Sequence, residues 1–277
     1  MVQIITDTST LYKPDEAKAL GFEAIPLCVN VGEFEGRDLL IDMDDYYERI
    51  RKGGIPKSSQ PPIGEVFEMY EKYEDCEIIN ISMADGLSGT YQSACSAKEM
   101  LEDSSKVTVV NSKTLCGPHR YMVEKAQEMK EKGCSAKEIL DWLDYIKERS
   151  ESFLIPQDFD FLRRGGRLTP VAAALGSVLK LKPIMTLTED CKRLDKFAVK
   201  RTMKSAVDAI ISHLKTRNLD SRHILYISHA DALDDAKKIM AQMKETFVEL
   251  EVKILELSPV FVAQGGPKCV AIQYIER

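Results

Sequence analysis

The alternation of short apolar runs with longer amphipathic segments constrains the fold of this chain more than any other feature. In the first half, Val2–Thr6, Glu77–Ile81 and Val107–Asn111 are apolar runs of strand length. Helical patterns of about 10–15 residues separate such runs, and parallel strands need crossover connections of that length. This half therefore predicts an α/β/α arrangement around a parallel sheet. It is also expected to contain a strand over Glu23–Val31 and helices over Pro14–Leu20, Asp42–Lys52, Ile63–Tyr73, Thr90–Leu101, Pro118–Lys132 and Ser135–Arg149.

The second half follows a different pattern. Ile184–Thr188 and Arg193–Phe197 are strand-like runs joined by Glu189-Asp190-Cys191-Lys192, and this spacing predicts a hairpin. Because a hairpin is antiparallel, we expect a mixed sheet in a second α/β domain. The predicted domains are residues 1–150 and 151–277. The other elements expected in the second are Phe153–Pro156, Asp158–Arg163, Val171–Leu179, Thr202–Lys215, His223–Ile227, Ala232–Thr246, Val252–Leu257 and Val270–Tyr274.

Composition and charge exclude several classes of protein. The 277 residues include 38 basic and 44 acidic side chains, whereas nucleic-acid-binding proteins usually carry a basic face. The start, MVQIITDTST, lacks the basic-then-apolar order of a signal peptide, and no stretch of about 18 uncharged apolar residues occurs. We therefore expect a cytoplasmic protein with no nucleic-acid partner and no stable membrane insertion.

Cysteine and motif spacing predicts neither a metal site nor a cofactor. The seven cysteines are scattered without a closely spaced pair, which favours free and mostly buried thiols over a disulfide framework or a zinc site. Glycine-rich nucleotide motifs and the HExxH zinc motif are also missing from the sequence. We therefore expect no metal and no cofactor.

Two segments carry hydroxyl groups where a ligand could bind. Ser88-Gly89-Thr90 follows a predicted strand and opens a predicted helix, so the helix N-terminus there would attract an anion. Ser58-Ser59 lies in PKSSQPPIG, where three prolines stiffen a predicted loop. Thr6-Asp7-Thr8-Ser9 forms a third polar loop, and open α/β sheets bind ligands at such strand ends. Two purely structural interpretations stay open: Ser88 caps its helix, and Ser58-Ser59 is a surface turn.

Arginine side chains form a second kind of candidate site. Arg163-Arg164-Gly165-Gly166-Arg167 places three guanidinium groups on a glycine turn, which suits a phosphate or an acidic partner surface. The same turn could instead be solvated and packed on Asp158 and Asp160. Arg201 follows a predicted strand, where it could serve as a countercharge or lie exposed.

A serine hydrolase is an alternative function. Gly86-Leu87-Ser88-Gly89-Thr90 matches half of the nucleophile motif G-x-S-x-G, with Thr90 at the last glycine position. His229 follows a predicted strand and precedes Asp231, so a Ser88–His229–Asp arrangement is conceivable. A phosphate- or nucleotide-responsive module built on Arg163–Arg167 is a third hypothesis.

Ordered segments along nearly the whole chain resemble the DegV family of bacterial fatty-acid-binding proteins. These segments are IITDTST, PKSSQPPIGEVFEMYE, DGLSGTYQSA, VVNSKTL, FLRRGGRLTPVAAALGSVLKLKPIMTL, KRTMKSA and SPVFVAQGGP. The resemblance implies two α/β domains and a buried long acyl chain, C16–C18 as in palmitate. It also implies a partner, the fatty acid kinase, which phosphorylates the carboxylate of the bound lipid, so that the binding protein is not itself the catalyst.

The resemblance further implies roles for single residues. Ser58 stands where the family has a threonine that touches the carboxylate, and Ser88 stands at the family's Leu-Ser-Gly-Thr serine. Ser59, Gly89, Thr90, Arg201 and Gln264 complete the expected lipid-binding set, and Arg163, Arg164 and Arg167 are the expected kinase-binding residues. Gln264 replaces a family histidine, so it keeps the capacity for hydrogen bonds but cannot become cationic.

Physical chemistry assigns the affinity to the acyl chain. A C16 chain desolvates about fifteen carbons, which at ~0.8 kcal/mol each is a gross gain of roughly 12 kcal/mol. A charge-assisted hydrogen bond contributes only about 1.5–3 kcal/mol. We therefore expect the hydroxyl groups to orient the lipid, with tunnel walls drawn from Val171–Leu179, Ile184, Met185 and Val260–Val262.

Overall fold

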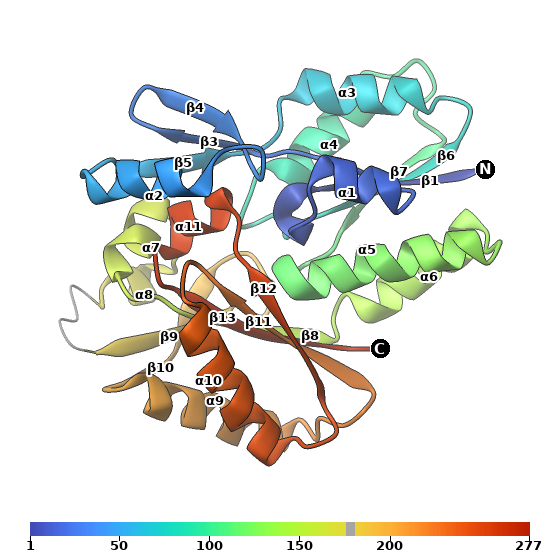
Figure 1. Ribbon diagram of the computed structural model, residues 1–277. Helices are drawn as coiled ribbons and strands as arrows, with labels where there is room; N and C mark the ends of the chain where they lie inside the picture. Colours follow the sequence, from blue (N-terminus) through green and yellow to red (C-terminus); the bar gives the residue numbers. More distant parts are fainter. Residues whose placement is uncertain (176–180) are drawn as a thin grey trace. The chain divides into compact units, whose positions relative to one another are not determined.

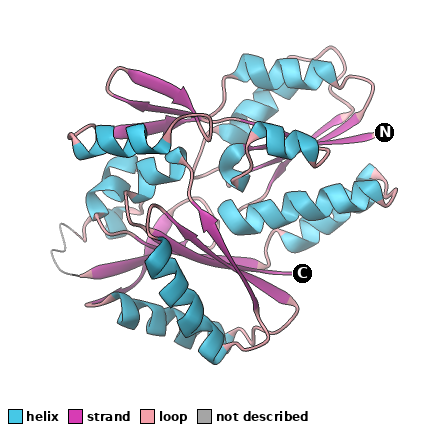
Figure 2. Cartoon of the chain, in the orientation of Figure 1, coloured by secondary structure: helices cyan, strands magenta, loops and turns pink. Residues whose placement is uncertain are grey.

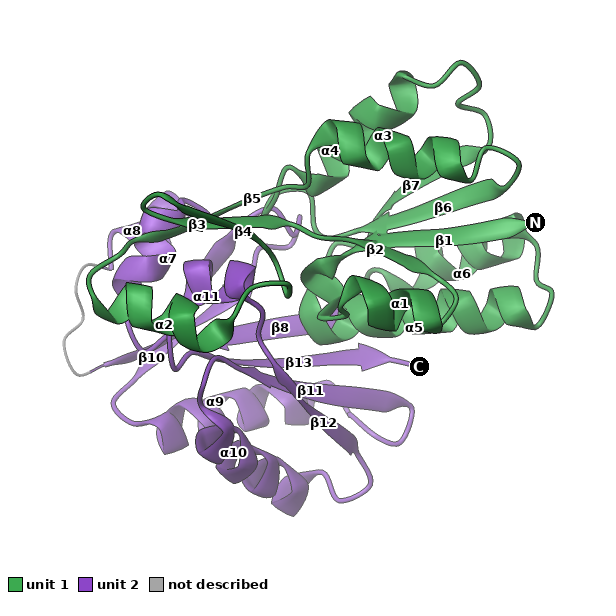
Figure 3. Ribbon diagram, turned by 45° about the horizontal axis from the view of Figure 1, so that its top comes forward, with its two compact units in different colours: residues 1–148 green, residues 149–277 purple. Residues whose placement is uncertain are grey.

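A computed structural model describes residues 1–175 and 181–277, and the strands in these ranges form three sheets (Figure 1). The chain divides into two compact units, Met1–Glu148 and Arg149–Arg277 (Figure 3). Each unit has its own apolar core. No helix in the described ranges is both long and apolar enough to cross a bilayer.

The first unit contains the predicted parallel sheet. Its four strands have the order β2-β1-β6-β7, and every neighbouring pair is parallel. All six residues of β1 are buried, because helices cover both faces of the sheet and neither side of the strand faces water. The strands are β1 (Val2–Asp7), β2 (Glu23–Ile25), β6 (Glu77–Ser82) and β7 (Val107–Asn111).

Helices cover both faces of this sheet, which confirms the α/β/α prediction. The core on one face joins Ile5 and Ile78 of the sheet to Val66, Tyr70 and Ala94 of α3 and α4. Helices α5 and α6 lie on the other face (Figures 1 and 2). The helices of the unit are α1 (Pro14–Ala19), α2 (Met43–Arg51), α3 (Ile63–Lys72), α4 (Thr90–Glu99), α5 (Cys116–Glu131) and α6 (Ala136–Ile146), with a 3-10 helix over Thr8–Thr10.

A small antiparallel sheet in this unit was not predicted. It has the order β4-β3-β5, formed by β3 (Cys28–Val31), β4 (Phe34–Arg37) and β5 (Pro56–Ser59). Two predictions were therefore wrong. The expected single strand over Glu23–Val31 is interrupted at Pro26, which has no N–H to donate, and the expected Ser58-Ser59 loop is part of strand β5.

The second unit contains the predicted mixed sheet. Its strand order is β10-β9-β8-β13-β11-β12, in which only β11 and β12 pair in parallel. The predicted hairpin is confirmed as β9 (Lys182–Leu187) and β10 (Leu194–Lys200), paired antiparallel. The other strands are β8 (Ser150–Ile155), β11 (His223–His229), β12 (Glu251–Glu256) and β13 (Val270–Glu276). The helices are α7 (Phe159–Gly165), α8 (Pro170–Ala173), α9 (Met203–Thr216), α10 (Leu233–Thr246) and α11 (Pro259–Gly265).

Each face of this sheet has its own apolar cluster. Ile184 belongs to the large core formed with α9 and α10, whereas its neighbour Met185 packs with α7 and α8. Successive strand residues point to opposite faces. Ile184 and Met185 therefore cannot line one tunnel together, although the sequence analysis expected both in its walls. The predicted helix over Val171–Leu179 is helical through Ala173, and residues 176–180 lie outside the described part.

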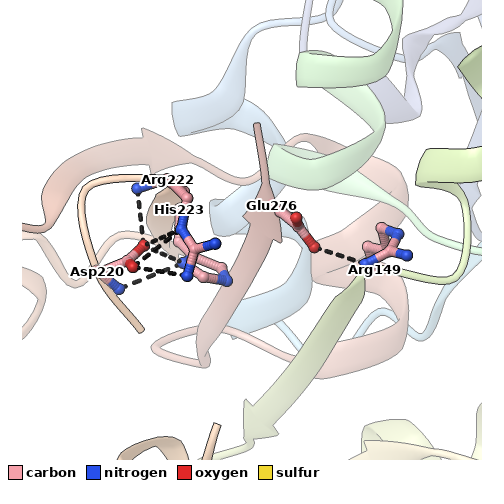
Figure 4. A network of polar contacts seen from close by, with 5 residues as sticks. All are labelled: Arg149, Asp220, Arg222, His223 and Glu276. Atoms are coloured by element: carbon pink, nitrogen blue, oxygen red, sulfur yellow. Dashed lines mark hydrogen bonds and ion pairs between the residues drawn. The ribbon is translucent and has the colours of Figure 1, made fainter. Parts of the chain in front are cut away.

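A polar network lies at the start of β11, opposite its His229 end (Figure 4). The Asp220 carboxylate accepts hydrogen bonds from Arg222 Nε (2.9 Å) and lies 3.1 Å from His223 Nδ1. These hydrogen bonds, those from Arg222 first, lower the pKa of Asp220. Arg149 pairs with Glu276 at 2.8 Å, so charged contacts hold the strand ends together.

All seven cysteines lie in the described ranges and are free thiols. Cys116 and Cys269 are buried, and the other five are half-buried, so the expectation of mostly buried thiols was wrong. Burial raises the pKa of Cys269 to about 12, which keeps this thiol protonated and unreactive at neutral pH.

Candidate functional site

Ser88 lies between β6 and α4 in the first unit. Helix α4 begins at Thr90, as predicted, and Gly89 is its N-cap residue. Ser88 Oγ lies 2.8 Å from Thr90 Oγ1 and accepts a hydrogen bond from Thr90 N at 3.3 Å. The hydroxyl therefore supports the helix start, as in the purely structural interpretation. Since a serine hydroxyl has one donor and two acceptor positions, one further hydrogen bond to a ligand remains possible.

Ser58 and Ser59 are neighbours on strand β5, and this determines where they point. Ser58 pairs opposite Val29, which is buried, and Ser59 pairs opposite Cys28. Cross-strand partners share a face, and successive residues alternate between faces. Ser58 is half-buried and Ser59 is exposed. At most one of the two hydroxyls can therefore face a given head group, whereas both had been expected to do so.

The structure brings the two hydroxyl-bearing segments together at Gln60. A β-carbon placed on Gly89 would lie 3.0 Å from Gln60 Oε1. Close by, Ser93 Oγ donates to the carbonyl oxygen of Pro61 at 3.5 Å. The chain just beyond Ser58-Ser59 thus lies against the Ser88 segment. The sequence analysis did not single out Gln60. Its close approach to the Ser88 segment depends on Gly89, which has no side chain.

The third polar loop, after β1, forms a buried network. Asp7 accepts hydrogen bonds from the N–H groups of Ser9 (2.9 Å) and Met83 (3.1 Å). His119 Nε2 lies 3.0 Å from the carbonyl oxygen of Ile81 and donates to it, so Nδ1 accepts from Ser9 Oγ at 2.8 Å. These side chains are buried, so they fix the loops at this edge of the sheet and do not face a ligand. No local sequence pattern links His119 to Ser9.

His119 should make the stability of the protein depend on pH. Burial lowers its pKa, although Asp7 acts in the opposite direction. The unfolded chain binds a proton near pH 6.5 while the native imidazole stays neutral, so the free energy of unfolding is highest above pH 6.5. Below that value it should fall by up to ~1.4 kcal/mol per pH unit until the native pKa is reached.

The measurement compares chemical unfolding of the unaltered protein and His119→Gln at pH 7.5 and 5.5. Gln keeps a polar group in the site but does not titrate, so the stability gap between the two proteins should narrow at the lower pH. His229, whose pKa burial also lowers, contributes equally to both proteins. A gap that stays constant would contradict the assignment.

The arginine turn lies at the end of α7 in the second unit. Arg163 pairs with Asp160 at 2.9 Å, and the Arg164 guanidinium lies 4.8 Å from the centre of the Phe161 ring. Arg167 donates to the carbonyl oxygen of Gly165. Arg163 and Arg164 are exposed and Arg167 is half-buried, so the turn presents positive charge at the surface. Arg201, between β10 and α9, is also exposed.

Gln264 packs directly on this turn. It lies on α11, and its Oε1 occupies the position that a β-carbon of residue 165 would take. At Gly266, with φ +77°, a β-carbon would lie 3.0 Å from the Phe161 ring. Helices α7 and α11 therefore approach each other through glycines. The structure thus joins a predicted head-group residue, Gln264, to the predicted partner-binding turn.

This packing predicts that the effect of Gly165→Ala on stability depends on residue 264. In the unaltered protein the new methyl group must displace the Gln264 amide, which should lower the melting temperature. In a Gln264→Ala background the space is empty, and alanine in a helix is favoured over glycine by about 0.5–1 kcal/mol, so the same change should raise it. Thermal unfolding of the four proteins measures the coupling, and strictly additive effects would show that the two residues do not interact.

The hydrolase arrangement is not supported by the local geometry. A nucleophile motif of this class places its serine on a sharp turn between a strand and a helix. Here seven residues, 83–89, separate β6 from α4, and Ser88 is not among the residues with positive φ. In the second unit, His229 Nδ1 accepts a hydrogen bond from Ala232 N at 3.3 Å. Over residues 1–175 and 181–277, no cluster of His, Cys, Asp and Glu suits a metal ion.

These features define a class of two-unit α/β proteins, with hydroxyl groups near strand ends in the first unit and a glycine-packed helix pair in the second. The profile of a family described as "Uncharacterised protein, DegV family" matches residues 1–277. A DegV domain-containing protein of Halalkalibacterium halodurans is 31% identical over 285 residues, which cover 100% of this chain and 99% of the relative. The chain therefore belongs to the DegV family.

Solved structures of relatives have the same fold. A DegV family protein from Thermus thermophilus, described for its fatty acid binding, has a TM-score of 0.90 and 26% identity, covering 100% of this chain and 99% of its own. DegV from Bacillus subtilis, described as a fatty acid binding protein, has a TM-score of 0.85 and 28% identity over the same shares.

Proposed function

We propose that this protein binds one long-chain fatty acid and holds its carboxylate with the hydroxyl groups of Ser58 and Ser88. The observation that carries the proposal is the contact between Gln60 and Gly89, which brings the two serine-bearing segments together. Ser58 is chosen over Ser59 because it lies on the half-buried side of β5. The fatty acid binding described for the Thermus and Bacillus relatives supports the same ligand class. Thr90 and Gly89 contribute by fixing Ser88 at the helix start.

The second unit contributes the apolar surroundings of the acyl chain in this proposal. The cluster around Met185 is suited to that role, since the short helices α7 and α8 cover it instead of the long helices α9 and α10. Its buried members are Phe159, Leu162, Leu168, Ala172 and Met185. Ile184 is not part of the proposal, because it belongs to the core under α9 and α10. Arg201 and Gln264 remain candidates for further contacts with the carboxylate.

The arginine turn is proposed as the docking face for a fatty acid kinase, so that the protein presents its lipid in the cytoplasm and needs no cofactor of its own. The exposed guanidinium groups of Arg163 and Arg164 suit an acidic partner surface. Arg167 closes the turn by its hydrogen bond to Gly165.

Arg167→Glu is expected to reduce coupling to the kinase at low salt by about tenfold, because it reverses a charge on the docking face and repels an acidic partner. Lipid content should stay unchanged. Lys237→Glu, at an exposed residue of α10, is the matched control with the same change in net charge. Equal rates of lipid phosphorylation for both variants would remove the turn from the interface.

The fatty acid itself is tested by native mass spectrometry of the purified protein, followed by denaturing extraction. We expect a one-to-one adduct of about 250–285 Da, the mass of an acid with the C16–C18 chain considered above. The released compound should be a free fatty acid. If the protein stays without an adduct even after incubation with C14–C20 fatty acids, the proposed function is wrong.

A further inference from the structure

A hollow in the first unit lies between the C-terminal ends of α3 and α4. Its volume of about 490 Å³ falls within the range of ligand pockets. Ile78 and Val107, at the starts of β6 and β7, place it at the amino-terminal edge of the parallel sheet. Ser88 follows the opposite, carboxyl-terminal edge. The apolar floor consists of Phe67, Tyr70, Ile78, Leu101 and Val107, and Met100, 53% exposed, lies at the rim.

The rim of this hollow, which we name the acidic groove, is strongly negative. Its exposed carboxylates are those of Glu71, Glu74, Asp75, Glu102 and Asp103. Across the described residues, none of these five forms a salt bridge. Hydrogen bonds from Ser105 lower the pKa of Asp103, which favours the charged form of this carboxylate. Lys106 is the one basic residue among the described lining, and its ammonium group donates to the Glu74 carbonyl oxygen at 3.1 Å.

The helices strengthen the negative field. Both α3 and α4 end at the groove, so the partial negative charges of two helix C-termini add to those of the carboxylates. Lys72, in the last turn of α3, does not offset them, because its ammonium group pairs with Glu23 at 2.6 Å and does not line the groove. An anionic lipid or nucleic acid would be repelled here, whereas a cation would be attracted.

We propose that the acidic groove docks a basic amphipathic segment of a partner protein, with apolar side chains on the floor and Lys or Arg side chains against the rim. The floor distinguishes this occupant from a simple polyamine, which has no bulky apolar side chains to bury. A methionine at the rim suits such a groove, since its flexible thioether adapts to different apolar partners. A second copy of this chain is disfavoured by its net charge of −6.

The test uses a labelled amphipathic helix of about 14 residues made of Leu and Lys, and a matched peptide with Glu in place of Lys. Fluorescence anisotropy with the full chain should show binding of the Lys peptide only, weakened at least about tenfold between about 0.05 M and 0.5 M salt. A triple variant, Glu71→Lys, Asp75→Lys and Glu102→Lys, should lose at least about tenfold in affinity. The control variant is Glu68→Lys, Glu99→Lys and Glu33→Lys: it makes the same change in net charge with exposed residues, two of them on α3 and α4, that do not line the groove.

Hydrogen exchange should show protection by the peptide at residues 67–76 and 100–107 in the unaltered protein. Equal affinity of the two triple variants for the Lys peptide would overturn the proposal. Two other results would do the same: spermidine displaces the peptide with an affinity equal to the peptide's own, or the unaltered protein self-associates and only the groove variant abolishes this. Bound fatty acid is measured in the same samples and should not change. A loss of lipid binding would therefore bear on the proposed function, and a loss of peptide binding on the groove.

Discussion

Ser88→Ala is expected to keep the fold and to weaken fatty acid retention by about 10- to 100-fold. The hydroxyl group would supply one charge-assisted hydrogen bond to the carboxylate, worth about 1.5–3 kcal/mol, and each 1.4 kcal/mol is a factor of ten in affinity. Much of the affinity should survive, because burial of the acyl chain contributes more of the binding free energy than the head group does. The variant also loses the contact to Thr90 N, so the free energy of unfolding should fall by about 1 kcal/mol or less.

Two alanine variants separate the head group from general effects of losing a hydroxyl group. Ser59 is next to Ser58 but on the other face of β5, and Ser93 lies in α4 with only a long contact to Pro61. Both should bind a fluorescent fatty acid with unaltered affinity in a competition assay. Should Ser88→Ala match these controls in affinity and in lipid content, Ser88 does not contact the carboxylate.

Met185→Ala and Ile184→Ala are expected to lower the stability of the protein to a similar extent and to differ in their effect on lipid binding. Both side chains are fully buried, and truncating such residues costs about 2–5 kcal/mol. Only Met185 faces the cluster proposed to surround the acyl chain. The cavity left by Met185→Ala should shift the preference toward longer chains, since the added methylenes can fill it.

The measurement is competition among C14–C20 fatty acids for each variant, with thermal unfolding of the same samples. Ile184→Ala serves as the control for loss of stability, because it removes a similar volume from the opposite face of the same strand. The same chain-length profile in all three proteins would exclude this cluster as the acyl site.

Much of the architecture could be predicted because apolar strand runs are a strong signal. Val2–Thr6 and, after Glu77, the residues 78–81 are buried on both faces, so their largely apolar pattern pointed to a parallel sheet. The hairpin at Glu189–Lys192 was equally clear from its spacing. The small sheet was missed because Phe34–Arg37 and Pro56–Ser59 are short and mostly polar, and their pairing with β3 decides their structure.

The candidate site was predicted only where its features are local. The helix start at Thr90 follows from the sequence around Ser88, and the structure agrees. The alternation of Ser58 and Ser59 could not be predicted once their segment was taken as a loop. Contacts between distant residues, such as Ser9 with His119, depend on the tertiary fold and leave no pattern in a single sequence.

The contact of Gln264 with Gly165 has a consequence for the evolution of the family. A long side chain at position 264 and a β-carbon at position 165 compete for the same space, so neither position is free to mutate first without a loss of packing. The two positions should therefore have diverged as a pair among descendants of a common ancestor. Because Gly165 lies in the arginine turn, a change at position 264 would also limit the conformations that this turn could later adopt.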